Sequence, residues 1–313
     1  MSSADPVDPA ARDGAGAAPK TWIVGRGRVG RALHVALPGA QLLAGRADTA
    51  ACATPANTAQ TRDLVRVLAQ RTALEPLIFA VPDAALRAAA ERVALALRGT
   101  QSSAGAGVAL HTSGALAADA SGPLAPLVDL GFDVGALHPL RAVPAGGGPG
   151  VLRGALAAIA GGPAALATAR ALAQAVGLEV FEIAAAGEAR VRYHAGACLA
   201  AGGAVALIDA ALALFASAGI ERDLGRRALC DLVVSAANNT RATPAASALT
   251  GPIARGDVDV VAAHLASLRG PDLARERDLY RTLSSRLLAL VSHTLSPQDG
   301  ARLAALLHDL PEH

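Results

Sequence analysis

The sequence predicts an α/β fold in two domains: a Rossmann-type, doubly wound and mostly parallel sheet, followed by an all-α C-terminal region. Between residues 21 and 185, short apolar runs alternate with helix-like segments, which is the pattern of a parallel sheet covered by helices on both faces. After residue 188, apolar positions recur only at helical spacing. The length of 313 residues also suits two domains of ordinary size.

We therefore divide the chain into three parts. Residues 1–19 are rich in Ala, Asp, Pro and Gly and are expected to form a disordered leader. Residues 20–185 form the predicted nucleotide-binding domain, and residues 186–313 form the predicted helical domain. The boundary falls in the small-residue stretch at 184–187.

Strands and helices are expected to alternate along the first domain. The predicted strands are residues 21–25, 41–45, 76–83, 107–114, 133–140, 155–162 and 178–183. The predicted helices are residues 28–37, 61–70, 84–97, 124–130 and 164–176, and a glycine-rich loop is expected at 145–150.

Five helices are expected in the second domain, at residues 188–217, 224–240, 257–268, 271–292 and 297–310. The stretch 195–220 is apolar enough to resemble a membrane span, but Asp209 interrupts it. A central Asp costs roughly 2.5 to 3.5 kcal/mol on insertion scales. We therefore expect no membrane association and interpret the stretch as a buried helix, of the kind found in a domain core or a subunit interface.

Composition argues against several classes of function. The net charge of +2 and the small number of aromatic side chains, one Trp, two Tyr and four Phe, are unlike a nucleic-acid-binding protein. Cys52, Cys198 and Cys230 form no Cys-x-x-Cys pair, so neither a disulfide framework nor a metal site is expected. With no signal-peptide core in the leader, the sequence predicts a cytoplasmic protein.

The first strand leads into a glycine pattern typical of dinucleotide binding. Gly25, Gly27 and Gly30 satisfy G-x-G-x-x-G between the predicted strand and helix. The first glycine makes the tight turn, the second admits the diphosphate, and the third lets the helix pack on the strand. The helix N-terminus then offers free N–H groups to the anion. A purely structural turn is the alternative.

The variable positions of this turn are Arg26, Arg28 and Val29. All three are assigned to the cofactor site, with Arg28 the better phosphate ligand because it begins the helix.

The end of the second strand bears on which nucleotide binds. NAD-binding units place Asp or Glu there to accept hydrogen bonds from the ribose. This chain has Arg46, whose guanidinium can pair with a 2'-phosphate, so NADP is favoured. Asp48 lies two residues further on and leaves NAD as an alternative cofactor. The alternative for Arg46 is a solvated turn residue with no role in binding.

The third strand ends in Val81, Pro82 and Asp83. Loops at the carboxyl ends of parallel strands line the ligand crevice, so these residues are expected to flank the cofactor. Asp83 also suits the N-cap of the following helix.

Two further strand ends carry polar groups suited to a reaction site. His111 and Ser113 lie at the end of the predicted fourth strand, and His138 lies at the end of the fifth. A hydride-transfer site needs an acid or base beside the reacting carbon, and histidine titrates in the useful range. A hydroxyl can hold the substrate. For each histidine, a purely structural role is the alternative to a catalytic one.

Six stretches resemble a known family in order and approximate spacing: "VGRGRVGRAL", "FAVPDAAL", "HTSGAL", "GALHPLRAV", "RYHAGACLA" and "ALTGPIARGD". The family is bacterial and uncharacterised, and it joins a Rossmann-like NADP-binding domain to a helical C-terminal domain of unknown function. It is similar to pyrroline-5-carboxylate reductase, prephenate dehydrogenase and the deazaflavin-dependent NADP reductases.

The resemblance implies a C-terminal domain like that of 6-phosphogluconate dehydrogenase, a homodimer formed through these helices, and an active site between domains. By analogy with prephenate dehydrogenases it assigns acid/base and hydrogen-bonding roles to His138 and Ser113. Family members carry Ser, Asn and an aromatic residue where this chain has Ala201, Gly202 and Gly203. This departure leaves Tyr193 and His194 as the nearest polar candidates.

Together these features predict an NADP-dependent oxidoreductase that transfers a hydride between nicotinamide and a small carbonyl, imine or hydroxy compound. Lys20 is the chain's single lysine, which argues against a lysine-dependent mechanism. A non-catalytic nucleotide sensor or regulatory protein is the main alternative, and reduction of a deazaflavin is a third possibility.

Overall fold

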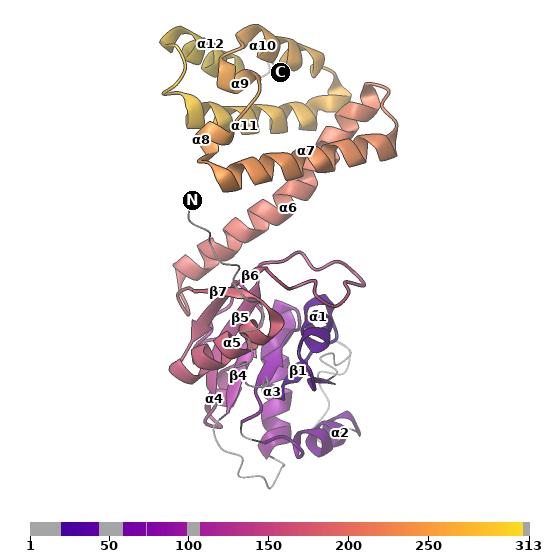
Figure 1. Cartoon of the computed structure of the whole chain (residues 1–313), viewed down its shortest axis with the longest axis vertical. Coiled ribbons are helices and arrows are strands. Elements are labelled where there is room, and N and C mark those ends of the chain that lie inside the picture. Colours follow the sequence, from indigo (N-terminus) through magenta and orange to yellow (C-terminus); the bar gives the residue numbers. More distant parts are fainter. Residues whose placement is uncertain (1–19, 44–58, 73, 99–106, 309–313) are drawn as a thin grey trace, which may run out of the picture. The chain divides into compact units, whose positions relative to one another are not determined.

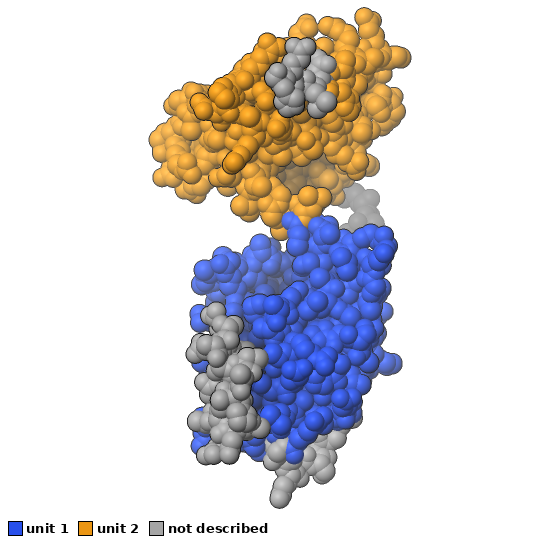
Figure 2. Space-filling view, turned by 180° about the vertical axis from the view of Figure 1, so that it is seen from behind, with its two compact units in different colours: residues 1–198 blue, residues 199–313 orange. Residues whose placement is uncertain are grey.

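The computed structural model describes residues 20–43, 59–72, 74–98 and 107–308. The predicted leader and the positions Arg46, Asp48 and Cys52 lie outside the described residues. The chain divides into two compact units, unit 1 within residues 1–198 and unit 2 within residues 199–313 (Figure 2). This division falls inside a long helix, whereas the sequence analysis places the domain boundary in the loop before that helix.

Unit 1 is built on a sheet with helices packed beside it (Figure 1). The sheet has seven strands in the order β2-β1-β3-β4-β5-β6-β7. Strands β1 to β5 are parallel, β6 runs antiparallel to β5, and β7 is parallel to β6. The prediction of a mostly parallel Rossmann-type sheet is confirmed. The strands are β1 (Trp22–Val24), β2 (Gln41–Leu43), β3 (Leu77–Phe79), β4 (Val108–His111), β5 (Asp133–Pro139), β6 (Leu156–Gly161) and β7 (Glu179–Glu182).

The reversal at β6 follows from the connection before it. A parallel crossover needs a covering element, usually a helix, to carry the chain back across the sheet. The described chain forms no helix between β5 and β6, where the glycine-rich loop lies. The chain therefore turns back beside β5 in the antiparallel direction.

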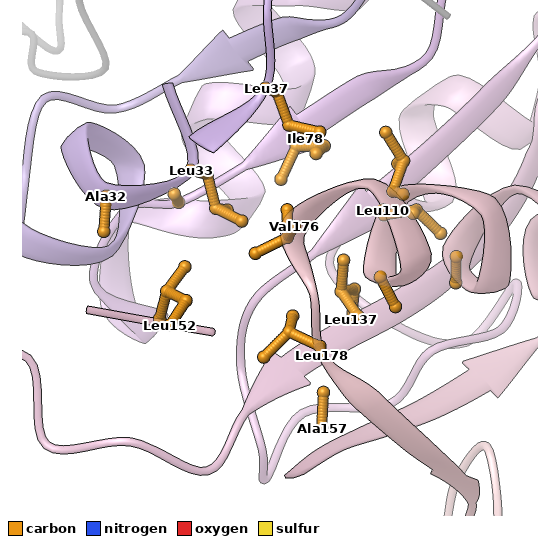
Figure 3. Close-up of a cluster of buried hydrophobic side chains, with 14 of the residues drawn as sticks. Ala32, Leu33, Leu37, Ile78, Leu110, Leu137, Leu152, Ala157, Val176 and Leu178 are labelled. Carbon is orange, nitrogen blue, oxygen red and sulfur yellow. The ribbon is translucent and has the colours of Figure 1, made fainter. Parts of the chain in front are cut away.

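Helices cover both faces of the sheet, as predicted from the alternating pattern. Those of unit 1 are α1 (Arg28–Ala36), α2 (Ala59–Leu68), α3 (Asp83–Arg98), α4 (Ala125–Val128) and α5 (Pro163–Val176). On one face α1 and α5 pack against the strands, and Figure 3 shows Leu33 and Val176 meeting Ile78 and Leu137 there. On the other face α2, α3 and α4 enclose Trp22, Phe79 and their neighbours.

Neighbouring residues of a strand face opposite sides, so β1 sends Ile23 to the first cluster and Trp22 and Val24 to the second. All three are 3% exposed or less. Burying a Leu, Ile or Val side chain fully stabilises a fold by about 1.5 to 3 kcal/mol. The sheet is therefore fixed from both sides, and the loops at its carboxyl edge stand on a rigid support.

The strand order creates a switch point between β1 and β3. From β1 the chain passes through α1 to β2 on one side, and it then returns through α2 to β3 on the other side of β1. In open α/β sheets, ligands bind in the crevice at the carboxyl ends of the strands where the order reverses. The glycine turn after β1 and the turn after β3 border this position.

The rest of the described chain is helical, as predicted. The elements are α6 (Glu188–Ser217), α7 (Arg222–Ala242), α8 (Ala245–Ala248), α9 (Pro252–Arg255), α10 (Val258–Ser267), the 3-10 turn η1 (Pro271–Leu273), α11 (Ala274–Val291) and α12 (Pro297–His308). The core of unit 2 comes from α9 to α12, around Val261, Leu288 and Leu303. Helices α8 and α9 were not predicted, because they are single turns too short to show a helical period.

Helix α6 is the exception to the expected burial. Only 6% of its most apolar window is buried, and Val191, Leu199 and Val205 are 57%, 77% and 69% exposed. By length and composition it is the one helix of the described chain that is able to cross a membrane. Of the two expected placements, a domain core and a subunit interface, the domain core is wrong, because α9 to α12 supply that core instead. The subunit interface stays a prediction.

Candidate active site

The glycine turn has the geometry that the dinucleotide pattern requires. Gly25 has φ +128°, and a Cβ there would lie 2.2 Å from the carbonyl oxygen of Ala80. A Cβ on Gly30 would lie 2.0 Å from the carbonyl oxygen of Gly25, so α1 packs on the turn without room for a methyl group. Beside Gly27 the nearest atom would be 3.9 Å away. The outer position is open to a ligand while the other two are closed by the chain.

The start of α1 suits an anion. Gly27 is its N-cap, no side chain caps it, and its first turn contains no acidic residue. Arg26 and Arg28 are exposed and form no ion pair with any described residue. Val29 is partly buried and packs on the core, so it would meet a ligand through its backbone N–H. A helix N-terminus with two free guanidinium groups beside it favours a diphosphate.

The turn after β3 carries the next three candidates. Val81 packs against the core, and Pro82 and Asp83 are exposed. The Asp83 carboxylate accepts a hydrogen bond from the Ser113 hydroxyl at 2.9 Å. This bond joins the β3 and β4 ends along the carboxyl edge of the sheet.

Ser113 has no bonding capacity left over. Its hydroxyl donates to Asp83 and accepts from the backbone N–H groups of Ala115 and Leu116 at 3.2 and 3.1 Å. A hydroxyl has one donor and two acceptor sites, so all are occupied. In this state Ser113 shapes the loop after β4.

The two strand-end histidines differ in their surroundings. His111 is fully buried, and its Nδ1 accepts from the N–H of Ser113 at 3.2 Å while Nε2 donates to the carbonyl of Ala117 at 3.0 Å. Burial lowers the pKa of His111 to about 4. Both nitrogens are used inside the protein, so His111 has the structural role that the sequence left open.

His138 is half-buried at the end of β5 and pairs with Tyr193 of α6. The tyrosine hydroxyl and His138 Nδ1 are 2.7 Å apart, and the rings meet edge to face. Burial, then the neighbouring His194 and Arg190, lower the pKa of His138 to about 4, and burial raises the pKa of Tyr193 to about 12. Both groups are therefore neutral at neutral pH, and Tyr193 donates to Nδ1. The ring proton of His138 then lies on Nε2, which no described residue engages.

His194 stands beside this pair. Its ring centroid lies 5.6 Å from that of His138, its Nδ1 is buried without a partner among the described residues, and its Nε2 lies 3.4 Å from Cys198 Sγ. Gly114 closes the other side: a Cβ there would lie 2.4 Å from His194 Nδ1 and 2.8 Å from His138 Cε1. Only glycine leaves both imidazoles in place.

Arg190 is a residue of the site that was not predicted from the sequence. It is 1% exposed, and its guanidinium donates to the carbonyls of Leu116, Ser113 and Ala184 at 2.5, 2.8 and 3.5 Å. The signal was available, because Arg190 precedes Tyr193 and His194 by three and four residues, on the same helical face. It fastens α6 to the loop after β4 and so brings Tyr193 to His138.

No group of three or more potential metal ligands gathers among the residues that the structure describes. The assembled site is a row along the carboxyl edge of neighbouring strands: the glycine turn after β1, Asp83 after β3, Ser113 and Gly114 after β4, and His138 at the end of β5.

Comparison with known proteins supports the same architecture. Residues 155–287 match the model of DUF2520, a domain of unknown function. No curated protein matches the chain. Protein TM1727 from Thermotoga maritima is similar in structure, with a TM-score of 0.60, 18% identity, and coverage of 88% of this chain and 99% of that one. A protein of Bacteroides fragilis described as a candidate NADP oxidoreductase, BF3122, gives a TM-score of 0.58 and 18% identity over 86% and 97% of the two chains.

These likenesses define the class: a Rossmann-type sheet followed by a helical C-terminal region. Within that class residues 155–287 match the DUF2520 model, and the predicted resemblance to a Rossmann relative of unknown function is confirmed.

Proposed function

We propose that this protein is an NADP-dependent oxidoreductase that transfers a hydride between nicotinamide and a small carbonyl, imine or hydroxy compound. The observation that carries the proposal is the neutral His138–Tyr193 pair, with a free Nε2–H, on the same sheet edge as an open glycine turn. The description of the Bacteroides fragilis protein as a candidate NADP oxidoreductase supports the choice of cofactor class.

Gly27, Arg26, Arg28 and the first N–H groups of α1 would hold the cofactor diphosphate, and the turn at Val81 to Asp83 would flank it. When bound, the nicotinamide supplies or accepts the hydride. His138 Nε2 donates a hydrogen bond to the substrate oxygen and thereby polarises the carbonyl, the role that a neutral imidazole fills well.

As the carbonyl carbon accepts the hydride, the oxygen takes the Nε2 proton, and Nδ1 takes the proton of the Tyr193 hydroxyl. The positive charge of Arg190 lowers the cost of the tyrosinate that results, until Nδ1 returns the proton to Tyr193 and Nε2 takes one from water. In the opposite direction the same groups remove the proton of a hydroxy compound.

Fluorescence titration with NADPH and NADH tests cofactor binding. We expect Arg28→Ala to weaken NADPH binding by about tenfold, since a charge-assisted phosphate contact is lost. Arg31→Ala, which changes an exposed arginine on the same helix, is the matched control and should leave the affinity unchanged. Wild-type protein that binds neither nucleotide below millimolar concentrations would contradict the proposal.

The preference for NADP over NAD rests on Arg46, which lies outside the described residues. We expect Arg46→Ala to weaken NADPH binding more than NADH binding, because only NADPH carries the 2'-phosphate. Equal losses for both nucleotides would contradict the assignment.

A non-catalytic NADP sensor is the second candidate function. It is favoured by Ala201, Gly202 and Gly203, which stand where the resembling family carries Ser, Asn and an aromatic residue. A panel of keto acids, imines, hydroxy acids and a deazaflavin, assayed with bound NADPH, separates the two. Binding without turnover on any of them would favour the sensor.

We also propose that the protein is a cytoplasmic homodimer formed through its C-terminal helices. Uncovered apolar side chains on α6 and α7 support this, among them Leu199, Val205 and Leu232 at 77%, 69% and 64% exposure. Sedimentation should give the mass of a dimer, and Leu199→Asp with Val205→Asp should give a monomer. Leu74→Asp, at an 89% exposed position of unit 1, is the matched control.

A further inference from the structure

Arg190 places an unneutralised positive charge beside the candidate site. All three groups that accept its hydrogen bonds are backbone carbonyls, and no described carboxylate lies within ion-pairing distance of it. Carbonyl dipoles hold a guanidinium in position but leave its net charge intact. In a buried position this charge acts over a longer range than it would in water.

The acids near Arg190 are committed elsewhere. Asp83 accepts from the Ser113 hydroxyl, and Asp119 accepts from both the N–H and the hydroxyl of Ser121 at 2.9 and 2.6 Å. Their fields oppose that of Arg190 without cancelling it. At His138 the pKa-lowering effect of Arg190 exceeds the pKa-raising effect of Asp83, and the same order holds at His111.

The groups facing His138 are therefore mainly neutral or cationic. Tyr193, His194 and Arg190 approach from α6, His111 lies on β4, and Asp83 is the acid that acts on the ring from α3. Among the described residues, no carboxylate forms a hydrogen bond or ion pair with the imidazole of His138 or of His194. A substrate at His138 Nε2 would experience a net positive potential.

Resting on the oxidoreductase function above, we propose that Arg190 makes the site selective for carbonyl compounds over iminium ions. Reduction of a carbonyl moves negative charge onto oxygen and, through His138, onto Tyr193, and a nearby cation stabilises both. An iminium ion enters with a positive charge and loses it, so the same cation opposes its binding. Arg190 is thus a positioning residue that also sets the polarity of the site.

The wild-type test uses three ring compounds of matched size with NADPH: cyclopentanone, 1-pyrroline and the permanently charged N-methyl-1-pyrrolinium ion. We expect kcat/KM for cyclopentanone to exceed that for the pyrrolinium ion by at least about tenfold, which corresponds to one pKa unit of charge interaction. Equal or faster turnover of the pyrrolinium ion would overturn the inference and leave the oxidoreductase function standing. No turnover of any of the three, with NADPH bound, would overturn the inference, and the wider substrate panel described above would then decide on the oxidoreductase function.

The variant test compares Arg190→Gln, Arg190→Lys and the control Arg192→Gln, whose guanidinium is exposed and pairs with Glu188. Removing the charge should lower the ketone-to-iminium ratio by about tenfold. Arg190→Lys keeps the charge and should keep the ratio, even if kcat falls because backbone contacts are lost. Arg192→Gln should change neither the ketone-to-iminium ratio nor kcat.

Two readouts separate an electrostatic role from a structural one. NADPH affinity shows whether Arg190→Gln still folds. NMR titration of the His138 ring should show a higher pKa in Arg190→Gln than in wild type or Arg190→Lys. If Arg190→Gln does not fold, the ratio in Arg190→Lys decides: a wild-type ratio supports the inference, and a loss of selectivity overturns it. An unchanged ratio in folded Arg190→Gln would overturn it as well.

Discussion

The chain contains two tyrosines, and each pairs with a histidine. In unit 1 the His138 Nδ1–Tyr193 hydroxyl distance is 2.7 Å and the ring centroids are 5.8 Å apart; in unit 2 the corresponding values for His264 and Tyr280 are 2.9 and 5.7 Å. The pairs are nearly identical in local geometry. What differs is the position in the fold and the charges around each pair.

His138 ends a strand at the carboxyl edge of the sheet and is half-buried, with a second histidine and Arg190 beside it. His264 is exposed on α10, and Tyr280 of α11 packs on the helical core of unit 2. The same two side chains therefore make a candidate reaction site in one place and an ordinary interhelical contact in the other. The function of the pair comes from its surroundings.

The two pairs should differ most in how far kcat/KM falls when the histidine of each pair is replaced. His138→Gln should lower kcat/KM by about 100-fold to 10,000-fold, the usual contribution of a general acid or base. His264→Gln should leave kcat/KM within a factor of about two, because surface changes are usually worth less than 0.5 kcal/mol. Steady-state kinetics of both variants at matched NADPH saturation measures this, and similar losses would show that the comparison fails.

Gly114→Ala should disturb the first pair by crowding alone. The new methyl group would lie 2.4 Å from His194 Nδ1 and 2.8 Å from His138 Cε1, so both rings must move. We expect a loss of about 1 to 3 kcal/mol in unfolding free energy, typical of overpacking, together with lower activity. Gly300→Ala is the control, since nothing lies within 4 Å of its position; wild-type melting and rate in Gly114→Ala would contradict the geometry.

Removing each tyrosine hydroxyl should affect stability in both pairs but kcat only in the first. Tyr193→Phe loses the hydrogen bond to His138, whereas Tyr280→Phe loses those with His264 and Ser284. Each hydrogen bond contributes about 1 kcal/mol to stability. Only Tyr193→Phe should also lower kcat, by about tenfold to 100-fold, because the proposed proton relay ends at this hydroxyl. Chemical denaturation and single-turnover rates separate the two effects.

The free energy of unfolding should fall in acid, and His138 of the first pair should contribute part of this loss. His111 and His138 have folded-state pKa values of about 4 against an ordinary 6.5, so between these pH values the unfolded chain binds the protons first. The free energy of unfolding should therefore fall as pH drops from about 6.5 towards 4. Each pKa unit is worth about 1.4 kcal/mol, less for the half-buried His138 because solvent screens it.

His138→Gln should flatten this dependence in part. Urea denaturation at a series of pH values measures the slope. An identical slope in wild type and variant would mean that His138 is not held neutral by the fold.

Much of the architecture could be predicted because it depends on the spacing of residues that are near one another in the chain. Each of the seven strands and each long helix of the described chain was expected from the spacing of apolar residues. The glycine turn was expected from the spacing of Gly25, Gly27 and Gly30. The single-turn helices α8 and α9 were missed, since four residues show no period.

The exposure of α6 could not be predicted from its composition. An all-round apolar helix suits a domain core, a subunit interface or a membrane equally well. Which of these applies depends on what packs against it, and in unit 2 the helices α9 to α12 form a core of their own.

The sequence by itself therefore determined the class of fold, the glycine turn and the set of polar residues at the strand ends, because these depend on near neighbours in the chain. Only the tertiary structure decided their roles. It gave His111 internal partners, filled the bonds of Ser113 with Asp83 from 30 residues away, and brought Tyr193 to His138 across 55 residues. It also buried Arg190 against a loop 74 residues distant. Hydrogen bonds and burial of this range depend on packing, and packing is a property of the folded chain.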